Sequence, residues 1–222
     1  MELQQDEQKS RELSSQLVSI MTTEHYNLQT GRAMTISEAN GRASLFVGAV
    51  SSGLIALALV AQLSRLSAAF FVFGLIVLPT LFFMGLITFE RVLQSGLADV
   101  TYARGINRIR HLYLEYAPQM QPYFILGSHD DGETILQQES MIPTWVQSFL
   151  GMASMVAIIT SVLAGSFLGM LFILFALPLW ACIVAGGIGF LVSVVLLQTY
   201  QQGQWVRLQK SIPVNFPRQP KQ

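Results

Sequence analysis

The sequence predicts an all-α integral membrane protein with four transmembrane helices arranged as two hairpins. Residues 140–206 contain no Asp, Glu, Lys or Arg, and residues 43–89 contain only Arg65. About 20 apolar residues span a bilayer as a helix, so each segment is long enough to cross twice. Charged residues make up 12% of the chain, whereas soluble domains carry about 25%. This composition excludes an ordinary soluble fold.

Residues 1–42 are predicted to form an N-terminal cytoplasmic helical segment. Its apolar side chains recur at helical spacing, at Leu13, Leu17, Ile20 and Met21. Gly31 is a position at which this helix could end or bend. Glu38 and Arg42 have the spacing of an i, i+4 ion pair on a helix that continues toward the membrane. The polar start lacks the features of a signal peptide, so insertion is expected to depend on the internal helices.

Residues 43–89 are predicted to form the first transmembrane hairpin, with spans at 43–62 and 68–89. Small residues recur every four positions in the first span, at Ser44, Gly48, Ser52 and Ala56. They share one helix face, where another helix can approach closely. Pro79 lies inside the second span, where proline removes a backbone donor and favours a kink. Such a kink is either a fixed packing feature or a gate.

Residues 90–145 are predicted to form a cytoplasmic amphipathic helix followed by a loop. The helix is expected over 91–117, where apolar residues keep helical spacing, and it should end before Pro118. A turn-rich stretch follows, and a short helix is expected over 134–140.

The amphipathic helix carries a basic face. Arg104, Arg108 and His111 share that face, with Arg110 beside it. Arg104, Arg108 and Arg110 are predicted to contact anionic lipid headgroups just under the membrane. An anionic ligand such as a nucleotide is the alternative for the same side chains.

Residues 146–199 are predicted to form the second transmembrane hairpin, with spans at 146–174 and 179–199. A break at 175–178 keeps both helices close to bilayer length. It also places Trp180 at one membrane interface and a second aromatic set at the other. The second set consists of Trp145, Tyr200 and Trp205.

Both spans of the second hairpin carry small residues every four positions. In the first they are Ala153, Ala157, Ser161, Gly165 and Gly169, and in the second they are Ala181, Ala185 and Gly189. Lipid tails provide no hydrophobic drive for helices to associate, so close backbone packing has to supply it. These ladders predict a compact bundle, or a homo-oligomer formed through small-residue helix faces.

The distribution of basic residues predicts the orientation. Every Lys and Arg except Arg65 lies in 1–42, in 90–145 or in the tail at 200–222. These three segments share one side of a four-span chain, and the positive-inside rule puts them in the cytoplasm. The protein is therefore expected in the cell membrane with both termini cytoplasmic. The tail is expected to be disordered.

No catalytic, cofactor-binding or metal-binding residue is predicted, and the protein is not expected to be an enzyme. Sequence motifs for acyl transfer, phosphate binding and zinc proteolysis are absent. His129, Asp130, Asp131 and Glu133 carry metal-ligating atoms, but a glycine-flanked acidic turn is more commonly a solvated loop. The spans lack the ionisable residues of an ion relay, which disfavours a transporter. A net charge of zero gives no basis for nucleic-acid binding.

Two stretches, 28–44 and 102–110, carry a resemblance to known proteins. They read LQTGRAMTISEANGRAS and YARGINRIR, and they resemble a group of bacterial multi-pass membrane proteins. The resemblance covers most of the chain and implies no particular activity. The layout of a cytoplasmic helix, a helical hairpin and a second cytoplasmic helix is also similar to SLATT and Pycsar membrane effectors. Those families imply membrane disruption in antiphage defence, but this chain departs from them by its second hairpin.

The function expected from these observations is that of a multi-pass membrane protein with a structural, interaction or regulatory role and no enzymatic site. An oligomeric pore or membrane-disrupting effector is the first alternative, because small polar residues on the spans could line a pore. A small transporter is the second alternative. The lipid bilayer is the one partner that the composition requires.

Overall fold

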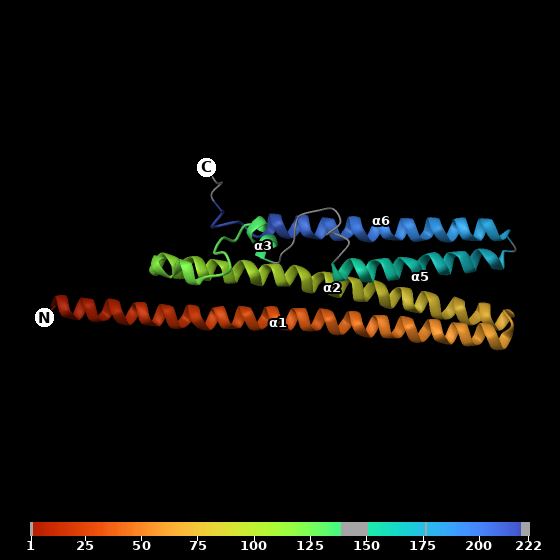
Figure 1. The fold of residues 1–222 in the computed structure, drawn as a ribbon, viewed down its shortest axis with the longest axis horizontal. Helices are drawn as coiled ribbons and strands as arrows, with labels where there is room; N and C mark the ends of the chain where they lie inside the picture. Colours follow the sequence, from red (N-terminus) through yellow and green to blue (C-terminus); the bar gives the residue numbers. More distant parts are fainter. Residues whose placement is uncertain (1, 139–150, 176, 219–222) are drawn as a thin grey trace. The chain divides into compact units, whose positions relative to one another are not determined.

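The structure is a computed structural model, and it describes residues 2–138, 151–175 and 177–218. These residues form helices joined by short connections, and no strand occurs among them, which confirms the all-α prediction. The helices are α1 (Glu2–Ser64), α2 (Ala68–Tyr116), η1 (Pro118–Tyr123), α3 (Gly132–Gln138), α5 (Met152–Leu174) and α6 (Leu179–Ser211) (Figure 1).

Four of these helices, α1, α2, α5 and α6, are long and apolar enough to cross a membrane. Their apolar stretches leave large side chains exposed, among them Leu45, Ile55, Phe83 and Ile183, each more than 60% exposed. Such exposure is unfavourable in water and neutral in hydrocarbon. The four helices are therefore compatible with a multi-pass membrane protein, as the sequence predicts.

The chain divides into two compact units. The first consists of Met1–Ile36, Ala98–Ile142 and Ile212–Gln222, and the second consists of Ser37–Leu97 and Pro143–Ser211. Helices α1 and α2 each contribute one part to each unit. The segment that starts at Ile212 therefore belongs to the first unit, although it directly follows α6, which belongs to the second unit.

The second unit has an apolar core to which α1, α2 and α5 contribute. Phe46, Leu93 and Val156 are almost completely buried in it. Glycines bring the helices together. A Cβ atom on Gly53 of α1 would lie 2.7 Å from the Leu81 Cδ1 atom of α2. A Cβ on Gly85 of α2 would overlap side chains of both α1 and α5, so side chains of the neighbouring helices pack directly against the backbone at these glycines.

Helices α5 and α6 pack along their small residues, side by side in Figure 1. A Cβ on Gly165 would lie 2.6 Å from the Gly186 carbonyl oxygen, and a Cβ on Gly186 would lie 2.9 Å from the Gly165 oxygen. The ladder predicted on α5 therefore contacts α6. On α6 the predicted Gly189 is in the contact, since a Cβ there would overlap the Leu168 Cδ1 atom of α5. At the other two positions the contacts are shifted by one residue, to Cys182 and Gly186 in place of Ala181 and Ala185.

The small-residue stripe predicted on the first span makes no such contact within the described residues. Ser44, Gly48 and Ser52 are exposed, and a Cβ on Gly48 would meet nothing within 4 Å. Helix α1 buries Ala43 and Phe46 instead. Bulky Phe46 makes more van der Waals contacts with α2 and α5 than a small side chain could, which favours this face.

Helix α1 runs through Gly31 and does not end there, contrary to one option left open by the sequence. A Cβ on Gly31 would lie 3.0 Å from the Tyr102 ring, so this glycine provides space for a side chain of α2. The predicted pair of Glu38 and Arg42 is confirmed, with 2.7 Å between Oε1 and Nη2.

Several helix ends match the prediction. Helix α2 runs through Pro79 and ends at Tyr116, before Pro118. Helix α5 ends at Leu174 and α6 begins at Leu179, at the predicted break. The predicted start of the third span at 146, with Trp145, lies outside the described residues.

The tail predicted at 200–222 differs most from the structure. Helix α6 continues to Ser211, past residue 199, where the predicted membrane span ends. The residues that follow are held by hydrogen bonds to the first unit, so the described part of the tail is ordered. The predicted disorder rested on composition, which does not register partners elsewhere in the chain.

Candidate functional site: a polar clasp around Asp130

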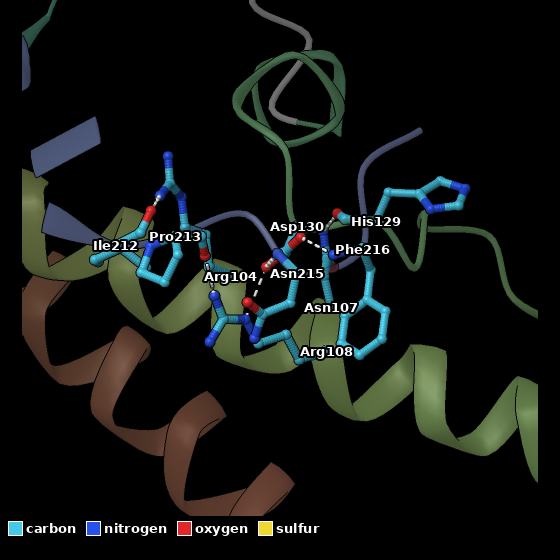
Figure 2. Close-up of polar contacts among 9 residues, drawn as sticks. All are labelled: Arg104, Asn107, Arg108, His129, Asp130, Ile212, Pro213, Asn215 and Phe216. Carbon is cyan, nitrogen blue, oxygen red and sulfur yellow. Dashed lines mark hydrogen bonds and ion pairs between the residues drawn. The ribbon is translucent and has the colours of Figure 1, made fainter. Parts of the chain in front are cut away.

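Asp130 is the centre of a polar cluster in the first unit. Its side chain is fully buried. Arg108 Nε donates to Oδ2 at 2.8 Å, and the backbone N–H groups of Phe216 and Asn215 donate to Oδ1 at 2.8 Å and to Oδ2 at 3.1 Å (Figure 2). The carboxylate is satisfied by three donors, as a buried charge requires.

Two arginines of α2 bind the chain segment just before Asn215 and Phe216 through its backbone carbonyl groups. Arg104 Nη1 donates to the Ile212 oxygen at 3.1 Å, and Arg108 Nη2 donates to the Pro213 oxygen (Figure 2). The two arginines lie one helical turn apart, so they reach neighbouring positions of one extended segment. Arg104 is only 3% exposed, which is rare for arginine in any protein.

Asn107 fixes the loop that carries Asp130. It is 1% exposed, and its Nδ2 donates to the His129 carbonyl oxygen at 2.8 Å. Its Oδ1 accepts from Arg110 Nη1 at 3.0 Å. We call Arg104, Asn107, Arg108, His129 and Asp130 the clasp, and Ile212–Phe216 the 212–216 segment.

The ring of Phe216 completes the contact. It stacks on His111 of α2, with ring centroids 4.1 Å apart. The Phe216 carbonyl accepts from the Asp130 N–H at 3.3 Å, so Phe216 and Asp130 exchange hydrogen bonds in both directions. Polar and aromatic contacts therefore hold the segment from two sides.

Asp131, the next residue, caps the start of α3. Its Oδ2 accepts from the Thr134 N–H at 2.9 Å and its Oδ1 from the Thr134 hydroxyl at 2.8 Å. This is the pattern of a helix N-cap, here at the start of α3. The Arg218 N–H also donates to Oδ1, at 3.3 Å.

Both carboxylates have lowered pKa values. Burial alone would raise the pKa of Asp130, but the amides of Phe216 and Asn215, and then Arg108, outweigh it and hold the pKa below its ordinary value. For Asp131 burial is likewise outweighed, mainly by the amide and hydroxyl of Thr134, and its pKa is lowered too. Both groups are held in the charged form.

A second ion pair joins α1 to α2 within this unit. Arg32 donates to both oxygens of Asp99, with distances of 2.8 Å from Nε and 3.1 Å from Nη2. Nearby, His25 stacks on Tyr113. Burial, and then the charge of Arg110, lower the pKa of His25, so the neutral imidazole is favoured there.

The basic face predicted from the sequence is thus brought together with the acidic turn. Arg104 and Arg108 face the 212–216 segment, whereas Arg110 contacts Asn107. The interpretation of the turn as a solvated loop was wrong, because Asp130 is fully buried. An available signal was the run of arginines on α2, at 104, 108 and 110, none of which has an acidic residue three or four positions away. Such a face can accept a carboxylate from another part of the chain.

The carboxylate at the centre of the cluster is fully engaged. The oxygens of Asp130 accept hydrogen bonds from an arginine and two amides, so this carboxylate is not available as a base. Among the described residues, no three His, Cys, Asp or Glu side chains are grouped so that they could hold a metal ion. What the arrangement can do is capture a stretch of polypeptide backbone.

Comparisons with protein-family models, with curated proteins and with solved structures found no match to this chain.

Proposed function

We propose that this chain is a multi-pass membrane protein with a structural, interaction or regulatory role and no enzymatic site. The proposed arrangement is two transmembrane hairpins in the cell membrane, joined by a cytoplasmic amphipathic helix, with both termini cytoplasmic. The four long apolar helices support the membrane location. The distribution of Lys and Arg supports the orientation.

The clasp is the observation that carries the proposed role. Its charged side chains bind a peptide segment through hydrogen bonds to backbone groups. The 212–216 segment directly follows α6, a proposed transmembrane helix, so the clasp ties the end of that helix to α2. A contact made of a few hydrogen bonds is well suited to open and close without unfolding the rest of the unit.

Exposed apolar side chains on the first unit support an interaction role. Ile20, Tyr26 and Met34 of α1 are 62%, 69% and 67% exposed. The proposed orientation puts these side chains in the cytoplasm, where they face water. A contiguous apolar patch exposed to water often marks a protein contact, so the interaction role requires these side chains to belong to such a patch.

The test is site-specific photo-crosslinking from position 26. A benzoylphenylalanine in place of Tyr26 should give a discrete protein adduct in cells, and the adduct pattern should change when Asp130→Asn opens the clasp. The matched control carries the photo-reactive residue at Ile183, which is 66% exposed on a proposed membrane span. Lipid adducts alone at both positions would contradict the interaction role.

An oligomeric pore or membrane-disrupting effector is the second candidate function. The exposed stripe of Ser44, Gly48 and Ser52 supports it, because such residues can pack against a second copy or line a pore. Overexpression with a membrane-potential dye separates the two functions. Depolarisation would favour the pore, and an unchanged potential at high expression would count against it.

Anionic lipid remains part of the proposal as a partner of Arg104, Arg108 and Arg110. Since Arg104 and Arg108 already donate to carbonyl groups of the 212–216 segment, a lipid phosphate would compete with that segment for the same donors. Lipid binding and release of the segment are therefore expected to be coupled.

A further inference from the structure

A large apolar groove lies within the second unit. Its volume is about 1020 Å³, and all four long helices line it. No Asp, Glu, Lys or Arg contributes to the lining, whose polar side chains are limited to Ser51, Ser166 and Cys182. Several of its large apolar residues, including Leu54, Ile183 and Leu179, are at least half exposed, so the groove is open to its surroundings.

The groove occupies one end of the unit. Phe70 and Phe71 line it just after the start of α2, and Ile173 and Leu179 line it at the break between α5 and α6. At a rise of 1.5 Å per residue, the lining runs for about 15 Å along α1, about 12 Å along α2 and about 16 Å along α6. Along α5 it runs for about 22 Å.

These lengths identify the class of occupant. The hydrocarbon core of a bilayer is about 30 Å thick, so along α1, α2 and α6 the groove covers only about half of the length over which a transmembrane helix of a second copy would run. Along three of its four walls, the length of the groove is close to the thickness of one leaflet of the hydrocarbon core. We propose that it holds an acyl chain of a phospholipid from the leaflet at that end, an inference that rests on the membrane location proposed above.

The wall chemistry fits a chain better than a polar ligand. Gly165, Gly169 and Gly186 keep α5 and α6 in backbone contact at the groove floor. Gly187 also lines the groove, yet a Cβ there would meet nothing within 4 Å, so its space is free for an occupant. Arg65, exposed in the turn at the same end, supplies a cation for a lipid phosphate.

The test fills the groove without disturbing the protein's own contacts. Gly187→Leu adds a side chain where a Cβ meets nothing within 4 Å, and Ser51→Phe adds a ring from the α1 wall, where Ser51 is exposed and lines the groove. The matched control is Gly203→Leu on the same helix as Gly187, also in open space but outside the lining. Each delipidated protein is incubated with palmitoyl-oleoyl phosphatidylglycerol, and bound lipid is counted by native mass spectrometry.

Wild type and Gly203→Leu should retain one phospholipid, and both groove variants should lose at least tenfold in occupancy. If Gly187→Leu and Ser51→Phe retained as much phospholipid as wild type, the proposal would be overturned. The same conclusion would follow if wild type retained a second copy of the chain or a free fatty acid in place of phospholipid. A groove variant whose unfolding temperature equals that of wild type is folded, and one such variant is enough to compare lipid occupancy with wild type. Failure of the membrane location is a separate result, because wild type would then leave the membrane fraction on carbonate extraction.

Discussion

Asp130 shows how one buried charge organises a segment distant in sequence. Its carboxylate binds Arg108, 22 positions earlier, and Phe216, 86 positions later. A buried carboxylate without donors would be strongly unfavourable, so these partners are required together. The 212–216 segment is therefore ordered by the same group that neutralises the arginine face of α2.

Replacing Asp130 by Asn should release the 212–216 segment. The change removes the charge opposite Arg108 and brings an NH2 group against a backbone N–H. A loss of about 1–3 kcal/mol in the docking of the segment is expected. Hydrogen exchange at the Phe216 amide measures it, and protection should fall about tenfold or more, since 1.4 kcal/mol corresponds to a factor of ten.

The matched control is Glu115→Gln, which removes an exposed carboxylate near the clasp. Glu115 is 58% exposed and lies 3.4 Å from His111, and such exposed pairs contribute little. Protection of Phe216 should be unchanged in this variant. Equal protection in Asp130→Asn would mean that the segment is held by other contacts.

The lowered pKa values predict a pH dependence at the acidic end. A group whose pKa is lower in the folded state stabilises it above the ordinary pKa, and this contribution is lost as pH falls through the folded value. Docking of the 212–216 segment should therefore be constant above about pH 5 and weaken only below the ordinary Asp value of 3.8. The Phe216 amide shift in an NMR titration measures this, and weakening already at pH 6 would contradict it.

At the scale of elements, the close packing of α5 on α6 depends on which glycine of a pair faces inward. Gly186 and Gly187 are neighbours in sequence, but only Gly186 lies against the Gly165 oxygen. A leucine at Gly165 would push α5 and α6 apart, because even a Cβ there would lie 2.6 Å from the Gly186 carbonyl oxygen. A loss of depolarisation in a Gly165→Leu variant would therefore report disrupted packing and would not identify a pore.

The two glycines predict opposite effects of alanine. Gly186→Ala puts a Cβ 2.9 Å from a backbone oxygen, and the forced shift should destabilise the unit by about 1–3 kcal/mol. Gly187→Ala meets nothing within 4 Å, so the better helix propensity of alanine should leave stability equal or up to about 1 kcal/mol higher. Thermal unfolding in detergent measures both. Equal unfolding temperatures would contradict the close approach.

At the scale of the whole molecule, the face of α1 with Ser44, Gly48 and Ser52 is exposed among the residues that the structure describes. If the proposed homo-oligomer uses this face, Gly48→Leu should shift the protein toward monomer, because a bulky side chain prevents close backbone approach. Gly203→Leu, equally open, is the control and should leave the oligomer intact. Light scattering of the detergent complex measures the mass, and an unchanged oligomer in Gly48→Leu would exclude this interface.

The sequence by itself determined the features that depend on local composition. The four apolar helices, the end of α2 before Pro118 and the break between α5 and α6 follow from apolar length and from proline, which act within a few residues. Gly31 was ambiguous, because a glycine in a helix can mark an end or a close contact. The ring of Tyr102, on another helix, decided that it is a contact.

Only the tertiary structure decided which faces pack and which charges are buried. The small residues of α6 allow two neighbouring faces, and the backbone of α5 selects the one with Gly186. The turn around Asp130 has the composition of a solvated loop, and the arginines and amides that bury it come from distant parts of the chain. Burial of a charge depends on such long-range partners, whereas sequence patterns register only neighbours along the chain.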